Sequence, residues 1–235
     1  MMLALSIAAV VLGSYIAWRL YFLRNPQRTT PPGNVVVSPA DGCVVYVKKV
    51  ERGEVPFAVK NSRSIRLSEV HDVKEFEQTS GLLIGIFMTP FSVHRNRAPV
   101  HGEVVVKKHF KNQLNLSMVR PFVEIFLRMK HFGDNEYYLT NERLTTGLRT
   151  ARGTVLVTQI ADEWINRIVS WVDPGDVLKC GQQFGMIRFG SQCDVFIPDT
   201  FALTVTTKVG QYVYAGETVL GTYGDHEPAS TSANA

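Results

Sequence analysis

Short runs of β-branched and aromatic residues, separated by glycine and proline, recur along most of the chain and constrain its fold most strongly. Runs of this length are typical of strands rather than helices. We therefore expect a mainly β domain (a β-rich α+β fold) of small, glycine-cornered sheets with a barrel-sandwich-like core and few helices. The expected strands cover residues 35–37, 42–50, 81–88, 102–107, 137–140, 153–160 and 194–197.

Four other segments complete this picture. Residues 112–130 mix Leu, Met, Phe and Arg and are expected to be partly helical, while residues 162–172 fit either element. Residues 204–223 predict two strands around a glycine turn. Their V-G-x-x-V-x-x-G-E pattern resembles the turns of lipoyl- and biotinyl-type barrel-sandwich domains. Residues 224–235 are small and polar, so we expect a disordered tail after a domain that spans 34–223.

The N-terminal segment is apolar. Residues 1–18 contain no charged side chain, and Arg19, Arg24 and Arg28 follow. This length is near the lower limit for crossing a bilayer, so we expect residues 1–23 to form a membrane anchor that spans or only dips in. A secretory signal peptide is the alternative, but a basic start and a small-residue cleavage site are missing. The proline-rich residues 24–33 are expected to be a linker.

The charge is unevenly distributed. The chain has 25 Lys+Arg and 21 Asp+Glu, a formal net charge of +4. Residues 191–235 hold one lysine and five acidic residues, a balance of −4, so the first 190 residues carry +8. Positive charge beside an apolar anchor favours an anionic membrane surface, with the domain in the cytoplasm. Nucleic acid is disfavoured as a partner, because no Lys/Arg run is interleaved with aromatic residues.

The cysteines exclude two kinds of site. Cys43, Cys180 and Cys193 are too few and too scattered for a disulfide framework or a zinc site. We therefore expect free thiols in a reducing compartment and no metal.

The segment 181–198, GQQFGMIRFGSQCDVFIP, is the most specific for chemistry. On its own, the Gly190-Ser191 pair between two strand-like runs indicates a turn. The whole segment, however, resembles the short bacterial form of the phosphatidylserine decarboxylase family, in which G-x-x-F-G-x-I-x-F-G-S holds a self-cleavage site. Asp162 and Glu163 depart from the family pattern. Further family-like segments occur in order at residues 22–26 (FLRNP), 38–42 (SPADG), 90–99 (PFSVHRNRAP), 141–143 (NER) and 159–161 (QIA).

The resemblance implies a self-processing decarboxylase. The Ser191 hydroxyl would attack the carbonyl of Gly190, and the resulting ester would eliminate to dehydroalanine and hydrolyse to a pyruvoyl group. Two fragments, 1–190 and 191–235, would remain associated. The pyruvoyl group would form a Schiff base with the amine of phosphatidylserine and accept electrons as CO₂ leaves, giving phosphatidylethanolamine. Neither pyridoxal phosphate nor a metal is then required.

A nucleophilic serine needs a base. His94 is the leading candidate, and Asp41 is the candidate to orient it. Longer family members carry a second histidine where this chain has Arg97, which leaves open whether His94 serves processing, decarboxylation or both. His101 is a nearby alternative. Arg95 and Arg97 are candidates for binding the lipid phosphate.

Two other functions remain open at this point. A membrane-tethered barrel-sandwich carrier or assembly module would need a lysine at a hairpin tip, but Lys208 lacks the usual flanking Met or small apolar residues. A serine hydrolase could use Ser191, His94 and Asp41, but no G-x-S-x-G elbow is present. An ester or ether lipid tail and a homodimer formed through edge strands also stay open.

Overall fold

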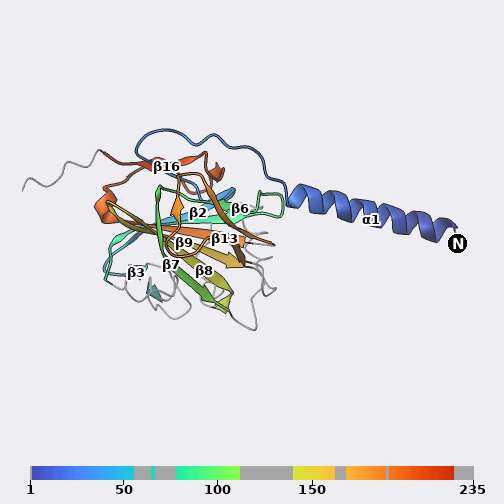
Figure 1. The fold of residues 1–235 in the computed structure, drawn as a ribbon, viewed down its shortest axis with the longest axis horizontal. Helices are drawn as coiled ribbons and strands as arrows, with labels where there is room; N and C mark the ends of the chain where they lie inside the picture. The colour runs from blue at the N-terminus through green and yellow to red at the C-terminus, as the bar shows by residue number, and fades with distance from the viewer. Residues whose placement is uncertain are drawn as a thin grey trace, which may run out of the picture.

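The computed structural model describes residues 2–55, 65–66, 78–111, 140–161, 168–188 and 191–224. Helix α1 (Met2–Phe22) projects from a β domain that holds nearly all the other described elements (Figure 1). The prediction of a mainly β fold with an N-terminal apolar helix is confirmed. The expected partial helix in 112–130, residues 137–139 of an expected strand, residues 162–167 and the tail from 225 lie outside the described residues.

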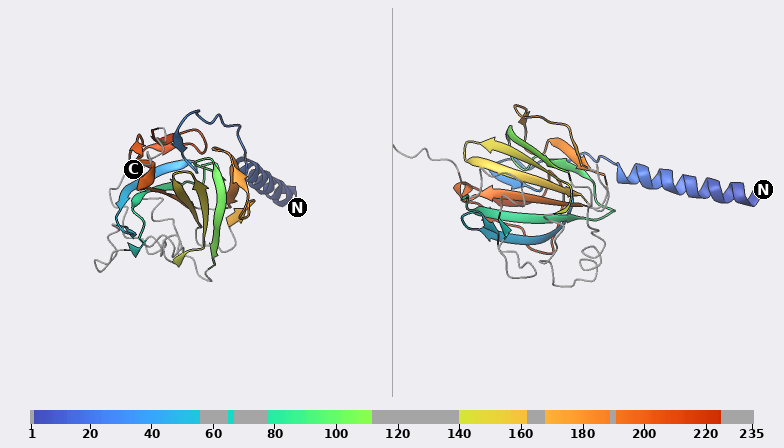
Figure 2. Two further views of the ribbon diagram at one scale, coloured as in Figure 1. Left: turned by 60° about the vertical axis from the view of Figure 1, so that its left-hand side comes forward. Right: turned by 90° about the horizontal axis from the view of Figure 1, so that it is seen from below.

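The largest sheet of the described chain has eight strands in the order β11-β7-β8-β9-β13-β5-β2-β15. Neighbouring strands are antiparallel, and the sheet curls into a half-barrel (Figure 2). Its members are β2 (Gly42–Val50), β5 (Gly81–Met88), β7 (Gly102–Phe110), β8 (Arg143–Thr150), β9 (Gly153–Ala161), β11 (Val177–Leu178), β13 (Ser191–Pro198) and β15 (Tyr212–Val213).

Three smaller sheets accompany it within the described ranges. Two are three-stranded, with the orders β1-β16-β14 and β10-β12-β6, and the third pairs β3 with β4. A 3-10 turn, η2 (Asp199–Phe201), follows β13. The strands are β1 (Val35–Val37), β3 (Glu54–Val55), β4 (Ile65–Arg66), β6 (Arg95–Arg97), β10 (Ile168–Ser170), β12 (Gln183–Ile187), β14 (Thr204–Val205) and β16 (Val219–Thr222).

The segment 204–223 differs from its prediction. It forms three short strands, β14, β15 and β16, rather than two. Gly210 and Gly216 both have positive φ angles, 87° and 75°, so the chain turns sharply before and after β15. As a result β15 pairs with β2 in the large sheet, whereas β14 and β16 pair with each other in a small one.

The strands fall into two matching sets. One set is β1, β2, β5, β13, β14, β15 and β16, and the other is β6 to β12. Outward from the central pair β13 and β9, the large sheet places β5 opposite β8, β2 opposite β7 and β15 opposite β11. Each set has a bulge at the same place, between Val44 and Tyr46 in one and between Val104 and Val106 in the other. The second set is inserted between β5 and β13 of the first.

The hydrophobic core joins the large sheet to both three-stranded sheets. Val36 of β1, Leu220 of β16 and Phe184 of β12 belong to the same buried cluster as Ile86 and Val195 of the large sheet. Because side chains alternate along a strand, Val195 faces this core while the neighbouring Asp194 lies on the opposite face. Both faces are buried at β13, so this strand is fixed inside the domain. Cys43, Cys180 and Cys193 are free cysteines.

Candidate active site

Three sequence-distant segments meet at one end of the large sheet. Asp41 immediately precedes β2, the loop that carries His94 follows β5, and Ser191 begins β13. The first residues of β2 and β13 both pair with the last residues of β5, as Cys43 with Phe87 and Ser191 with Met88. The sheet topology therefore gathers the three predicted catalytic residues into one region.

Ser191 lies in the middle of the sheet. Its backbone pairs with Met88 of β5 on one side and with Ala161 of β9 on the other. Gly190 lies outside the described residues. Because β13 pairs with β5 along its whole length, the strand that starts at Ser191 is held by its neighbours rather than by the peptide bond before it.

His94 has the hydrogen bonding of a neutral base. Its side chain is buried, and its Nδ1 lies 2.9 Å from the carbonyl oxygen of Ser92. A carbonyl can only accept, so Nδ1 carries the proton of the neutral ring and Nε2 keeps its lone pair. Nε2 is buried and makes no hydrogen bond within the described part of the protein. The Ile187 N–H donates to the carbonyl of His94 (3.1 Å), so His94 lies beside the end of β12, from which residues 188–190 lead to Ser191.

Burial sets the protonation state of this ring. It lowers the pKa of His94 to about 4, against the opposing effect of the Ser92 carbonyl and together with the positive charge of Arg24. The Phe22 ring stacks on the imidazole, with centroids 4.0 Å apart and planes at 29°. His94 is therefore neutral at pH 7 and able to accept a proton.

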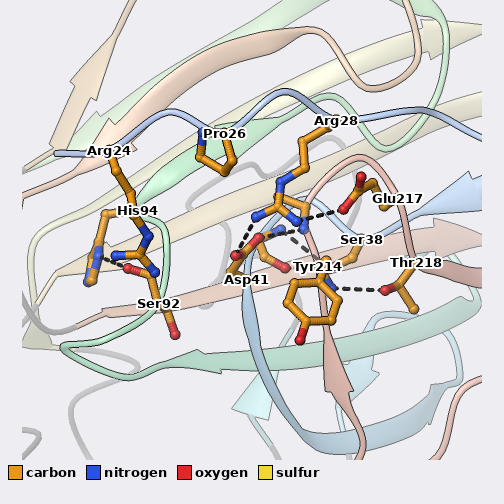
Figure 3. A network of polar contacts seen from close by, with 12 residues as sticks. Arg24, Pro26, Arg28, Ser38, Asp41, Ser92, His94, Tyr214, Glu217 and Thr218 are labelled. Atoms are coloured by element: carbon orange, nitrogen blue, oxygen red, sulfur yellow. Dashed lines mark hydrogen bonds and ion pairs between the residues drawn. The ribbon is translucent and has the colours of Figure 1, made fainter. Parts of the chain in front are cut away.

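Asp41 has other partners than expected. Its Oδ1 accepts from the Ala215 N–H (2.7 Å) and its Oδ2 accepts from Arg28 Nη2 (2.8 Å), as Figure 3 shows for Arg28. Within the described structure, the oxygen beside His94 Nδ1 is the Ser92 carbonyl and not the Asp41 carboxylate. An orienting role for Asp41 stays a prediction. Desolvation raises the pKa of Asp41, although the hydrogen bond from the Ala215 N–H and the charge of Arg28 oppose the shift. The carboxylate thus joins Arg28 of the expected linker to the backbone at Ala215.

Arg28 is the site residue that the sequence analysis missed. Its Nη1 donates to Glu217 (2.6 Å) while Nη2 donates to Asp41, and its side chain is 9% exposed. Thr29 adds a backbone hydrogen bond to Glu217 (3.2 Å). The expected linker is therefore bound to residues on both sides of position 190. An arginine in a proline-rich stretch carries no local signal that separates this role from a solvated charge.

The two arginines predicted to bind phosphate differ. Arg97 donates to the carbonyl oxygens of Gly181 (2.9 Å) and Pro26 (3.4 Å), so its guanidinium ties backbone segments together. Arg95 donates to the Gln183 side chain (3.2 Å), and its buried Nε makes no hydrogen bond in the described structure. Arg95 is the better candidate for an anion.

The remaining histidine candidate lies outside the site, whereas other motif residues support the segments around it. His101 is exposed in the turn before β7, away from the gathered residues. Asn96 donates to the Pro39 carbonyl (3.3 Å) and accepts from Gln159 (2.8 Å), while Asn141 donates to the Ala161 carbonyl (2.9 Å). These motif residues hold segments in place through buried hydrogen bonds.

The family follows from comparison with known proteins. A family model described as phosphatidylserine decarboxylase matches residues 15–221. The chain belongs to the phosphatidylserine decarboxylase family. The "Putative archaetidylserine decarboxylase proenzyme" of Methanocaldococcus jannaschii is 33% identical over 213 residues, which cover 90% of this chain and 93% of that protein. The "Phosphatidylserine decarboxylase proenzyme" of Geotalea uraniireducens is 37% identical over 204 residues, covering 86% and 78%.

Membership confirms the resemblance found in the sequence. This decarboxylase is a carboxy-lyase of the family that converts phosphatidylserine into phosphatidylethanolamine. Both relatives are named proenzymes, which fits a chain that matures by cleavage.

Proposed function

We propose that this chain cleaves itself between Gly190 and Ser191 and then decarboxylates phosphatidylserine at the cytoplasmic face of the membrane. The observation that carries the proposal is the buried Nε2 of neutral His94, on a loop that is hydrogen-bonded to the strand leading toward Ser191.

The first step is an acyl shift. Nε2 of His94 takes the proton of the Ser191 hydroxyl as the oxygen attacks the Gly190 carbonyl, and the proton passes to the departing amide nitrogen. The amide becomes an ester. Loss of the Cα proton then breaks the ester and leaves a carboxylate on Gly190 and dehydroalanine at position 191. Hydrolysis of the dehydroalanine releases ammonia and gives the pyruvoyl end group.

The surroundings of position 191 fit such a group. Once formed, its carbonyl supplies the electron sink that decarboxylation requires. Pairing of β13 with β5 and β9 keeps the new chain end at a defined place in the sheet. Because the buried His94 ring is neutral, its Nε2 can take a proton released when the substrate amine binds and pass it to the substrate carbon after CO₂ has left.

The substrate class is a serine phospholipid. Phosphatidylserine and the archaetidylserine of the Methanocaldococcus relative's name share the serine headgroup, so the ether lipid is the second candidate. The Arg95 guanidinium is suited to the headgroup phosphate.

The anchor is suited to deliver that substrate. Residues Leu5–Phe22 have a mean hydropathy of 1.5, and this helical segment is long and apolar enough to cross a membrane. Arg19 and Arg24 at its C-terminal end favour a domain on the cytoplasmic side. Phe91 beside this end is 65% exposed and is suited to contact the lipid surface.

Denaturing mass analysis of the purified protein, with a decarboxylation assay, tests the proposal. We expect two fragments, 1–190 and 191–235, the second with an N-terminal ketone that reacts with hydroxylamine. The carrier and hydrolase alternatives predict an intact chain, and an active, uncut chain with a free Ser191 hydroxyl would refute the mechanism.

A further inference from the structure

The end of the membrane helix is buried in the candidate site. Leu20 is 70% exposed and Tyr21 is 48% exposed, but Phe22 is only 2% exposed. Its ring stacks on the His94 imidazole, with the two centroids 4.0 Å apart, and also packs against Trp18. The last residue of the anchor therefore covers one face of the proposed base.

The residues after Phe22 are also bound to the site. Arg24 donates to the carbonyl of Phe91 (2.6 Å), on the loop that carries His94. Asn25 accepts from Gln183 (2.8 Å) of β12. Arg28 donates from Nη2 to the Asp41 carboxylate at 2.8 Å (Figure 3). A segment that served only as a tether would not need these contacts.

Phe22 and Arg28 each help to keep a buried side chain in the charge state that the proposed mechanism requires. A buried imidazole acts as a base only while it stays neutral and correctly oriented, and the Phe22 ring excludes water and fixes its plane. A buried carboxylate needs a counter-charge to stay ionised, and Arg28 provides it to Asp41. The Arg28 guanidinium also stacks near Tyr214, with its carbon 5.3 Å from the ring centroid, which limits its movement.

We propose that residues 22–28, at the end of the membrane anchor, are a working part of the active site, in which Phe22 is a positioning residue for His94 and Arg28 is a positioning residue for Asp41. The inference rests on the proposed function. It predicts that exchanging the anchor and residues 22–28 for an unrelated membrane helix abolishes self-cleavage before Ser191.

Chemical modification tests the Phe22 contact without requiring cleavage. The full chain with Ser191→Ala, in detergent micelles, is treated with diethyl pyrocarbonate, and modification of each histidine is followed by peptide mass analysis. Exposed His101 serves as the internal reference. We expect His94 to react more slowly than His101, and Phe22→Ala to accelerate its modification about tenfold or more, because protection by burial is lost.

Two variants control this experiment. Phe22→Leu keeps most of the apolar cover and should stay close to the parent, whereas Leu20→Ala removes a neighbouring side chain that is 70% exposed and should change nothing. If His94 reacts as fast as His101 in the parent, or if Phe22→Ala leaves its rate unchanged, the Phe22 assignment fails. This readout does not depend on catalysis, so it separates a failed inference from a failed proposed function.

Cleavage kinetics of the otherwise unmodified chain test Arg28. Arg28→Met should slow the appearance of the 191–235 fragment by about ten- to a hundredfold, the range for loss of a hydrogen bond between charged groups. Arg28→Lys should restore part of the rate. Arg149→Met is the matched control, because Arg149 forms an exposed ion pair with Glu103 (2.7 Å). Parental cleavage by Arg28→Met would reduce Arg28 to a tether and overturn the proposal.

The pH profile of cleavage gives a readout that a purely structural role would not move. Among the described residues, Arg24 is the charged group that acts on His94, and it stays in place in Phe22→Ala. Hydration of the uncovered ring should shift the acid limb of the cleavage rate from near pH 4 toward the ordinary histidine range. A slower variant with an unshifted acid limb would indicate general destabilisation and would contradict the assignment.

Discussion

The two matching sets of strands differ most at the place where the proposed cleavage occurs. In the second set, β8 and β9 are joined by a tight turn, because Thr150 pairs with Gly153. In the first set, Met88 and Ser191 form the corresponding pair, but the chain leaves after Met88 and returns only at Ser191. The proposed scissile bond therefore lies in a crossover that returns to the sheet, and not in a hairpin.

The turns before β2 and β7 show the same contrast. Val37 N–H donates to Pro99 O (2.9 Å) and Arg97 N–H donates to Pro39 O (3.0 Å), so the two turns contact each other symmetrically. Yet the first turn carries buried Asp41, whose carboxylate accepts from the Arg28 side chain and the Ala215 N–H, and the second carries exposed His101. The same backbone frame thus holds candidate chemistry in one set and solvent-facing residues in the other.

The largest expected effect concerns Ser191, where the chain returns to the large sheet. Ser191→Ala removes the nucleophile and should abolish both cleavage and decarboxylation, giving one full-length band on a denaturing gel. Ser170→Ala, which removes a partly buried hydroxyl of the second set, should cleave normally. Cleavage of Ser191→Ala at residue 190 would contradict the mechanism.

The next effect concerns how the free energy of unfolding changes as the pH falls, and it compares buried His94 with exposed His101. The pKa of His94 is lowered to about 4 in the folded protein, so between about pH 6.5 and pH 4 the unfolded state binds the extra proton. Stability is full above this window and declines through it, by at most about 3 kcal/mol.

His94→Gln should remove this decline, and His101→Gln should keep it, in denaturant titrations at several pH values. The pKa of buried Asp194 is raised to about 7, and its effect has the opposite sign, because protonation then favours the folded state. The difference between parent and variant cancels this contribution. A parent and His94→Gln with parallel pH dependence would disprove burial of a neutral ring.

A smaller effect compares the two turns directly. Asp41→Asn removes the charge that Arg28 and the Ala215 N–H bind, so we expect cleavage to slow about ten- to a hundredfold. His101→Asn should cleave at the parental rate, since its side chain is exposed. Timed gels after synthesis measure both, and equal rates would remove Asp41 from the site.

The smallest effect tests the shared frame. Gly85 and Gly147 occupy matching positions, opposite Tyr46 and Val106. A Cβ on Gly85 would overlap the Tyr46 ring, which cannot move freely because its hydroxyl donates to Asp194 (2.5 Å). Gly85→Ala should therefore cost about 1–3 kcal/mol of unfolding free energy.

In Gly147→Ala the new Cβ would lie 2.8 Å from Val106 Cβ. The Val106 side chain is not held by a hydrogen bond, so this variant should lose less unfolding free energy than Gly85→Ala in the same thermal or denaturant titration. The reverse order would show that the two sets are not packed alike at this position.

The sequence predicted β2 and β5 with their observed bounds, because both combine β-branched runs with a leading glycine. It missed β8, since the threonine- and arginine-rich RLTTGLRT lacks the expected apolar run. That strand owes its place to pairing with β7 and β9. The union of eight strands in one sheet was likewise not foreseen.

By itself, then, the amino-acid sequence determined the apolar helix, most strand positions and the chemical groups of the site, because these depend on side-chain type and local spacing. Only the tertiary structure decided which group holds which. The Ser92 carbonyl and the Phe22 ring contact His94, and Arg28 binds Asp41, because burial and sheet pairing bring these segments together. Such contacts depend on how distant segments pack, and no local pattern records them.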